Sequence, residues 1–268
     1  MHRREFLLST AAGSAAILAG CATSTATSTS SGKSGKTDTS CFELRIYHIA
    51  AGKQEALFDR FRQHTLKLFA RHGIESIGYW MPIDPADQRL HFLLRYPSRE
   101  AREKSWAAFV ADPAWQAAYK ASEANGTLVR SVENPFLILT DYSPAVRTGN
   151  VSNGGVWEWR SYTTPPARLP FLDARFRDHT IALFAKHGMN NYAYWHLMPD
   201  QVGADVTLDY FLTHASVEAA KKSFSAFGAD PAWKAAREAS EKAAGGSLTV
   251  PGGVRSLFLK PTDFSPTT

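Results

Sequence analysis

The sequence predicts an α+β fold made of two copies of one domain. Residues 42–80 and 157–195 align without a gap: each copy carries an Arg-Phe-Arg run ending in His-Thr, a Leu-Phe-Ala run ending in His-Gly, and a Tyr-Trp pair. A repeat of about 110 residues is too long for a solenoid unit and suits a small domain. In each copy, strand and helix patterns follow the order β-α-β-β-α-β, which is the ferredoxin-like arrangement.

Four strands are expected in the first copy, at residues 42–49, 74–81, 90–96 and about 127–140. The first alternates apolar and polar residues, which is the period of a strand with one buried face. The second runs into a turn rich in proline and aspartate, and the third is a short apolar run. The second copy contains the same elements, with a longer turn after its Tyr-Trp pair.

Two helical regions separate these strands. Residues 54–72 place apolar side chains at the spacing of an amphipathic helix, and Gly73 follows as a C-terminal glycine. Ser98 begins the second region as an N-cap, and Asp112 with Pro113 starts a further helical segment. Each repeat therefore has helices enough to cover one face of its sheet.

The chain divides into a first repeat at 41–144, a linker at 145–155 and a second repeat at 156–268. The face of each sheet that has no helices on it carries aromatic side chains, and these must be covered. Packing the two bare faces together gives a pseudo-dimeric α+β barrel within one chain. Because the duplication supplies the partner, we expect a monomer.

The first 21 residues are typical of an export signal. Arg3-Arg4 is a twin-arginine start, an apolar run covers 8–19, and Leu18-Ala-Gly-Cys21 resembles the lipobox of bacterial lipoproteins. The resemblance implies lipidation of Cys21, and the alternative is an ordinary secretory signal with a chance cysteine. By resemblance to Gram-negative lipoproteins, Ala22 after the cysteine favours an outer-membrane anchor that faces the periplasm.

Residues 22–40 are almost entirely Ser, Thr, Ala, Gly and Lys, a composition that predicts a disordered tether. The formal charge of +5 is mixed along the chain, so no basic stripe predicts nucleic-acid binding. The two cysteines are Cys21 and Cys41. With lipid on Cys21 no disulfide forms, whereas a Cys21–Cys41 bridge would only close the tether into a loop.

Short motifs stand at matching positions in the first copy and, in part, in the second. These are Glu43-Leu-Arg-Ile-Tyr47, His72-Gly73, Gly78-Tyr-Trp80, Leu90-His-Phe-Leu-Leu-Arg-Tyr96 and Asp112-Pro-Ala-Trp115 in the first, and Glu158, Arg160, Tyr162, His187-Gly188, Tyr194-Trp195 and Asp230-Pro-Ala-Trp233 in the second. Each repeat resembles a NIPSNAP domain of the dimeric α+β barrel superfamily. That superfamily includes cofactor-free monooxygenases, haem-degrading enzymes, isomerases and ligand-binding proteins, and fold analogy does not choose among them.

The copies differ in their third strands, where Asp209 and His214 stand in place of His91 and Tyr96. Any role carried by those positions is therefore served by one repeat only. His91 is a candidate ligand-binding residue.

Two histidines are the first candidates for catalysis. Counting 3.6 residues per turn places His64 in the apolar stripe of its helix, and His179 repeats the pattern. A buried imidazole needs a hydrogen-bonding partner. Each is therefore either a core histidine with such a partner, or a proton shuttle or axial ligand that faces a barrel cavity.

The Tyr-Trp pairs, Tyr79-Trp80 and Tyr194-Trp195, are the second candidates. Neighbouring residues on a strand point to opposite faces, so one member of each pair must face the barrel interior. These inward side chains either fill the core or line a pocket. Arg45 and Arg160 lie two residues after a glutamate on a strand. They either neutralise that glutamate beside the cavity or bind an anionic ligand group.

Two functions from different classes follow. One is a lipid-anchored module of the cell envelope that binds a small apolar molecule or a partner protein. The other is a small-molecule enzyme of the barrel superfamily, either a cofactor-free monooxygenase or a haem-handling protein. No metal-ligand spacing or cofactor motif is present, so no cofactor is required and no motif supports haem.

Overall fold

The computed structural model describes residues 39–268. The predicted signal peptide, nearly all of the predicted tether and Cys21 lie outside these residues. Cys41 is a buried free thiol, and burial raises its pKa to about 11. Within the described part of the chain, no helix has both the length and the hydropathy that a membrane span requires.

The first repeat follows the expected order of elements. It comprises β1 (Cys41–Ile49), α1 (Gln54–Arg60), a π-helical segment η1 (Phe61–Thr65), α2 (Leu66–Arg71), β2 (Glu75–Pro82), β3 (Arg89–Tyr96), α3 (Arg99–Ala111), α4 (Pro113–Ser122), β4 (Val129–Glu133) and β5 (Phe136–Leu139). The side chains of Ser98 and Asp112 cap α3 and α4, as the sequence predicts.

The second repeat has the same order. It comprises β6 (Val156–Thr163), α5 (Leu169–Arg175), the π-helical segment η2 (Phe176–Thr180), α6 (Ile181–Lys186), β7 (Asn190–Leu197), β8 (Thr207–His214), α7 (Val217–Ala229), α8 (Pro231–Ala243) and β9 (Val254–Pro261). The strand expected at 127–140 is broken into β4 and β5, because Pro135 between them has no N–H to donate to a neighbouring strand. Strand β9, the counterpart of both, is continuous.

The two repeats form one antiparallel barrel. Its strands follow one another in the order β1-β3-β2-β9-β6-β8-β7-β5, and β5 pairs with β1 to close the ring. The joins between the repeats are β2 with β9, where Trp80 faces Pro261, and β5 with β7, where Leu139 faces Trp195. The expected pseudo-dimeric α+β barrel is therefore confirmed, with hydrogen-bonded strand edges as well as packed faces.

A repeated Thr-Asp-aromatic-Ser-Pro motif strengthens both joins. In the first repeat, the Ser143 hydroxyl accepts a hydrogen bond of 2.9 Å from the backbone N–H of Tyr194. In the second, the Ser265 hydroxyl accepts one of 2.9 Å from the N–H of Tyr79. Each repeat thus satisfies a buried backbone donor of the other.

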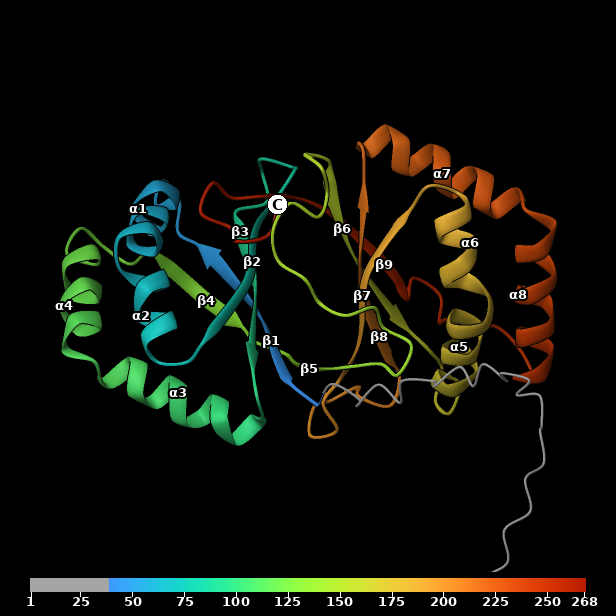
Figure 1. Cartoon of the computed structure of the whole chain (residues 1–268), viewed down its shortest axis with the longest axis horizontal. Coiled ribbons are helices and arrows are strands. Elements are labelled where there is room, and N and C mark those ends of the chain that lie inside the picture. Colours follow the sequence, from blue (N-terminus) through green and yellow to red (C-terminus); the bar gives the residue numbers. More distant parts are fainter. Residues whose placement is uncertain (1–38) are drawn as a thin grey trace, which may run out of the picture. The chain divides into compact units, whose positions relative to one another are not determined.

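Three apolar layers hold the molecule together. Helices α1–α4 lie on one side of the barrel and α5–α8 on the opposite side (Figure 1). One core lies between each helical group and its strands, and a third fills the barrel. The large side chains of this third core are fully buried: Trp80, Trp157, Trp195 and Phe211.

Candidate functional site

A cavity of about 590 Å³ opens at one end of the barrel. Its walls come from the second halves of β1 and β6, the first residues of β3 and β8, and the segments of β4, β9 and β7 beside them. Because inward and outward side chains alternate along a strand, most of the lining residues of β1, β3, β6 and β8 are two positions apart, whereas β9 contributes three consecutive residues. The exposed Val202, in the longer turn of the second repeat, also borders it.

The strand register places matching residues of the two repeats around the cavity. In the first repeat, Ile46 lies between His91 on β3 and Glu133 on β4. In the second, Ser161 lies between Asp209 on β8 and an arginine, Arg255, on β9. One side of the cavity therefore carries an imidazole and a carboxylate, and the other a carboxyl group, a hydroxyl and a guanidinium.

His91 is 3% exposed, and burial together with the charge of Arg89 lowers its pKa to about 4. The imidazole is neutral at neutral pH as a result. Its Nδ1 lies 3.2 Å from the carbonyl oxygen of Arg89, which can only accept, so Nδ1 carries the proton. The lone pair is then on Nε2, and His91 can take up a proton or accept a hydrogen bond from a ligand.

Asp209 is 6% exposed, and burial raises its pKa to about 6, although a hydrogen bond from Ser161 and the charge of Arg255 oppose this shift. Its Oδ1 has no hydrogen-bonding partner within residues 39–268. A buried oxygen without a partner carries a desolvation cost that a ligand donor would remove. With this pKa, Asp209 changes its protonation state closer to neutral pH than a free aspartate does.

The apolar wall of the cavity is aromatic. Trp159 lies at the surface of the cavity, with its ring edge-on to Phe211 at 4.6 Å and stacked on Trp195 at 6.0 Å. Leu44 and Leu257 add aliphatic surface. A planar or partly apolar molecule could lie against Trp159 while its polar end meets the ionisable residues.

Charged side chains surround the entrance. Arg89 pairs with Asp87 at 2.6 Å, and Glu133 pairs with His48 at 2.6 Å. Arg255 is exposed and forms no ion pair with another residue of the described chain. Arg255 is therefore the cation best placed to attract an anionic group toward Asp209.

The two predicted catalytic histidines lie elsewhere, and the prediction that they are buried is wrong. His64 and His179 are exposed on the helices, in η1 and η2. The π-helical turn is wider than the 3.6 residues used to count the stripe, so Thr65 and Thr180 face the core instead. Each threonine hydroxyl donates at 3.1 Å to the carbonyl of the arginine five residues before it.

The Tyr-Trp pairs divide between the two faces, as alternation requires. Tyr79 and Tyr194 lie in the cores under the helices, whereas Trp80 and Trp195 lie inside the barrel. All four are completely buried and none borders the cavity directly. Trp195 supports Trp159 from behind, which is its closest connection to the site.

Arg45 and Arg160 face the helices and not the cavity, so the prediction that they lie beside the cavity is wrong. Alternation places both on the outer face of their strands, opposite to Leu44 and Ile46. Each nevertheless neutralises its glutamate: Arg45 bonds Glu43 at 2.5 Å, and Arg160 bonds its own glutamate at the same distance.

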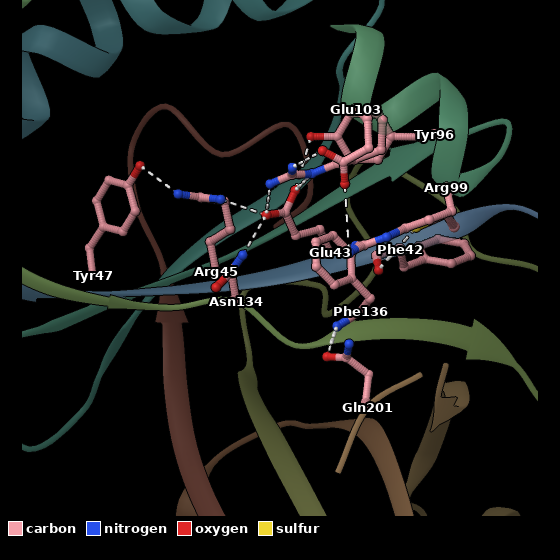
Figure 2. A network of polar contacts seen from close by, with 12 residues as sticks. Phe42, Glu43, Arg45, Tyr47, Tyr96, Arg99, Glu103, Asn134, Phe136 and Gln201 are labelled. Carbon is pink, nitrogen blue, oxygen red and sulfur yellow. Dashed lines mark hydrogen bonds and ion pairs between the residues drawn. The ribbon is translucent and has the colours of Figure 1, made fainter. Parts of the chain in front are cut away.

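Figure 2 shows the network around Glu43, which is fully buried. Besides Arg45, the carboxylate accepts from Nε and Nη2 of Arg102 at 2.9 and 2.7 Å and from the hydroxyl of Tyr96 at 3.2 Å. Burial opposes ionisation, but the hydrogen bonds from Arg102 and the charge of Arg45 hold the pKa of Glu43 below its ordinary value. This network joins β1 to α3 and is structural.

Of the residues predicted to bind or react, only His91 lies in the cavity. Sequence reasoning missed Asp209, Trp159 and Arg255 as site residues, although the replacement of His91 by Asp209 in the second copy was visible. On β1, the face that carries Leu44 and Ile46 lines the cavity, whereas the face that carries Glu43 and Arg45 contacts the helices. Within residues 39–268, no three metal-ligating side chains are grouped to hold a metal ion.

The NIPSNAP family model matches residues 42–144 and 157–266, which include almost all of both repeats. The chain belongs to the NIPSNAP family. Its two family segments match the two halves of the barrel, so the cavity lies between two NIPSNAP domains. Among curated proteins, no sequence matches the chain.

Solved structures share the whole barrel of this NIPSNAP protein. A candidate monooxygenase from Lactobacillus acidophilus has a TM-score of 0.55 at 12% identity, with 85% of this chain and 96% of that chain covered. One from Fusobacterium nucleatum has a TM-score of 0.53 at 8% identity, with 86% and 95% covered. An anthrone oxidase-like protein has a TM-score of 0.50 at 13% identity, with 84% and 92% covered. At these identities the likeness shows the fold alone.

Proposed function

We propose that this NIPSNAP protein binds a small, partly apolar molecule in the barrel cavity. The observation that carries the proposal is the pairing of an aromatic wall, Trp159, with two buried ionisable groups. Oδ1 of Asp209 has no hydrogen-bonding partner within residues 39–268, and the hydrogen bond of His91 to a backbone carbonyl uses Nδ1 and leaves Nε2 for a ligand. A ligand with a flat apolar part and a hydroxyl or amide end would satisfy both. A cavity of this kind favours a small molecule over the alternative occupant, a partner protein.

Ser161 offers the most direct test of this proposal. In Ser161→Phe the new ring would fill the cavity, and a molecule that copurifies with the protein should be lost. Native mass spectrometry of protein extracted from envelopes would detect it. Ser131→Phe, at an exposed position of β4, is the control. Absence of any bound species from the wild-type protein, or its retention in Ser161→Phe, would argue against the proposal.

We propose further that the barrel is held at the periplasmic face of the outer membrane by lipid on Cys21. The lipobox-like residues before Cys21 and the polar tether after it support this placement. In Cys21→Ser, the protein should leave the membrane fraction and appear in the soluble periplasm, as immunoblots of fractionated cells would show. A membrane-bound variant would remove the lipid anchor from the proposal.

A second candidate function is catalysis by proton abstraction without a cofactor, as in an oxygenase. The neutral His91 favours it, because Nε2 can accept a proton from an acidic C–H or O–H group of a ligand stacked on Trp159. The fold shared with candidate monooxygenases and an anthrone oxidase-like protein makes anthrone a suitable probe. Oxygen uptake with anthrone should be lost in His91→Phe and kept in His64→Phe, which changes an exposed residue. No uptake by the wild type would contradict this second function.

A further inference from the structure

A second, smaller cavity lies in the second repeat, away from the barrel end. It measures about 260 Å³ and lies between the helices and the sheet. Its deep walls are the rings of Phe176, Phe184 and Phe227, with Trp233 beside them. Its outer residues Arg237 and Glu241 also border an open groove along α8, which provides an entrance.

Arg175 lines this cavity with a charge that is poorly compensated. The residue is 5% exposed, and its guanidinium has no hydrogen bond to any other residue of the described chain. Its nearest carboxylate oxygen, on Glu241, lies at 4.0 Å. Burial lowers the pKa of Arg175, as expected for a cation without a close partner. The ring of Trp233 at 5.0 Å supplies only a cation–π contact.

The first repeat has an arginine at the matching position, and there the guanidinium is paired with a carboxylate. Its matching arginine, Arg60, bonds Glu123 at 2.8 Å and Ser122 at 3.2 Å. The ring of Tyr119 covers the Arg60 guanidinium at 5.3 Å. The second repeat has Arg237 where the first has this tyrosine, and Arg237 binds Glu241 at 3.1 Å. The glutamate is thus held by the outer arginine and kept away from the inner one.

We infer that this cavity binds a small monocarboxylate with an aromatic or branched apolar tail. Two arginines share one glutamate, so these three lining residues carry an excess of one positive charge. The planar guanidinium of Arg175 matches a carboxylate with two parallel N–H bonds, and its unpartnered Nε is one of the donors. The phenylalanine rings would surround the tail, and the small volume excludes large ligands.

Phenylacetate, benzoate and 4-methylpentanoate are suitable probes for the purified full chain. At least one should bind with a stoichiometry of one in isothermal titration calorimetry. The uncharged 2-phenylethanol should bind at least tenfold more weakly, because it leaves Arg175 unpaired. Inorganic phosphate should not compete, since it has no apolar tail. Failure of all three acids to bind, or equal binding by the alcohol or by phosphate, would overturn the inference.

Arg237→Tyr restores the residue of the first repeat and frees Glu241 to pair with Arg175. Acid binding should fall at least tenfold while the protein becomes more stable. Arg237 is largely exposed, so the variant should fold. Lys222→Tyr removes the same charge from an exposed position of α7, outside both the cavity and the groove, and should bind as the wild type does. Unchanged binding in Arg237→Tyr, or an equal loss in Lys222→Tyr, would contradict the proposed site.

Discussion

Two buried ionisable residues of the barrel cavity respond to pH in opposite directions. The pKa of Asp209 is about 6 in the folded protein, against 3.8 for the free group, so the folded state holds a proton that the unfolded state has released between these values. Stability is lost as the pH rises through that window. The pKa of His91 is about 4, against 6.5, so its contribution is lost as the pH falls from 6.5 to 4.

Asp209→Asn should therefore change the pH profile as well as the stability. At neutral pH the variant should be more stable by roughly 3 kcal/mol, because it has no buried carboxylate to ionise. Each unit by which burial raises the pKa of Asp209 corresponds to about 1.4 kcal/mol of lost stability at neutral pH. Its stability should rise steadily from pH 4 to 6.5 because only the His91 contribution remains. Urea unfolding across this range measures both effects. Asp205→Asn, at an exposed position of the preceding turn, should follow the wild-type profile.

The buried glutamates of the two repeats provide a matched comparison. Glu43 neutralises two arginines, whereas Glu158 bonds one arginine and the imidazole of His214 at 2.8 Å. Glu43→Gln should cost about 3–5 kcal/mol, because it leaves buried charges that arginine cannot release. Glu158→Gln should cost less, since it leaves one permanently charged guanidinium without its carboxylate instead of two. Equal losses in chemical denaturation would contradict this account.

At the scale of the helices, the π-helical segments decide which side chains face the core. The hydroxyl of Thr65 donates a hydrogen bond to the carbonyl of Arg60, whereas His64 beside it is in solvent. We expect Thr65→Val to lower stability by about 1 kcal/mol through loss of this buried hydrogen bond. His64→Ala should change stability by less than about 0.5 kcal/mol. Thermal unfolding of both variants distinguishes these roles, and a large loss in His64→Ala would show that the imidazole has a structural partner.

The sequence predicted the elements well because their signals are local. Alternation located the strands, and Ser98 and Asp112 located the helix starts. The π-helical turns escaped prediction because Leu57, Phe61 and Leu68 fit a regular helix equally well. The break at Pro135 was visible in principle, since proline cannot donate within a sheet. The site depended on which face of each strand points inward, and that choice is made by packing between distant segments.

At the scale of the whole molecule, the barrel depends on short joins between the repeats. We expect the full chain to be a monomer in multi-angle light scattering, because β2–β9 and β5–β7 pairing satisfies the edges that a single repeat would expose. The isolated first repeat, residues 39–144, should self-associate, since its inner aromatic face would otherwise contact water. An obligate dimer of the full chain, or a monodisperse single repeat, would contradict this expectation.

Fusion of the two halves also removes a constraint that identical subunits cannot escape. In a homodimeric barrel, every substitution beside the twofold axis occurs twice, so an imidazole faces an imidazole and a carboxyl group faces a carboxyl group. Here His91 and Asp209 occupy equivalent places, yet each can mutate alone. A cavity with different groups on its two sides can discriminate between the two ends of an asymmetric molecule, and a substitution on one side leaves the other side unchanged.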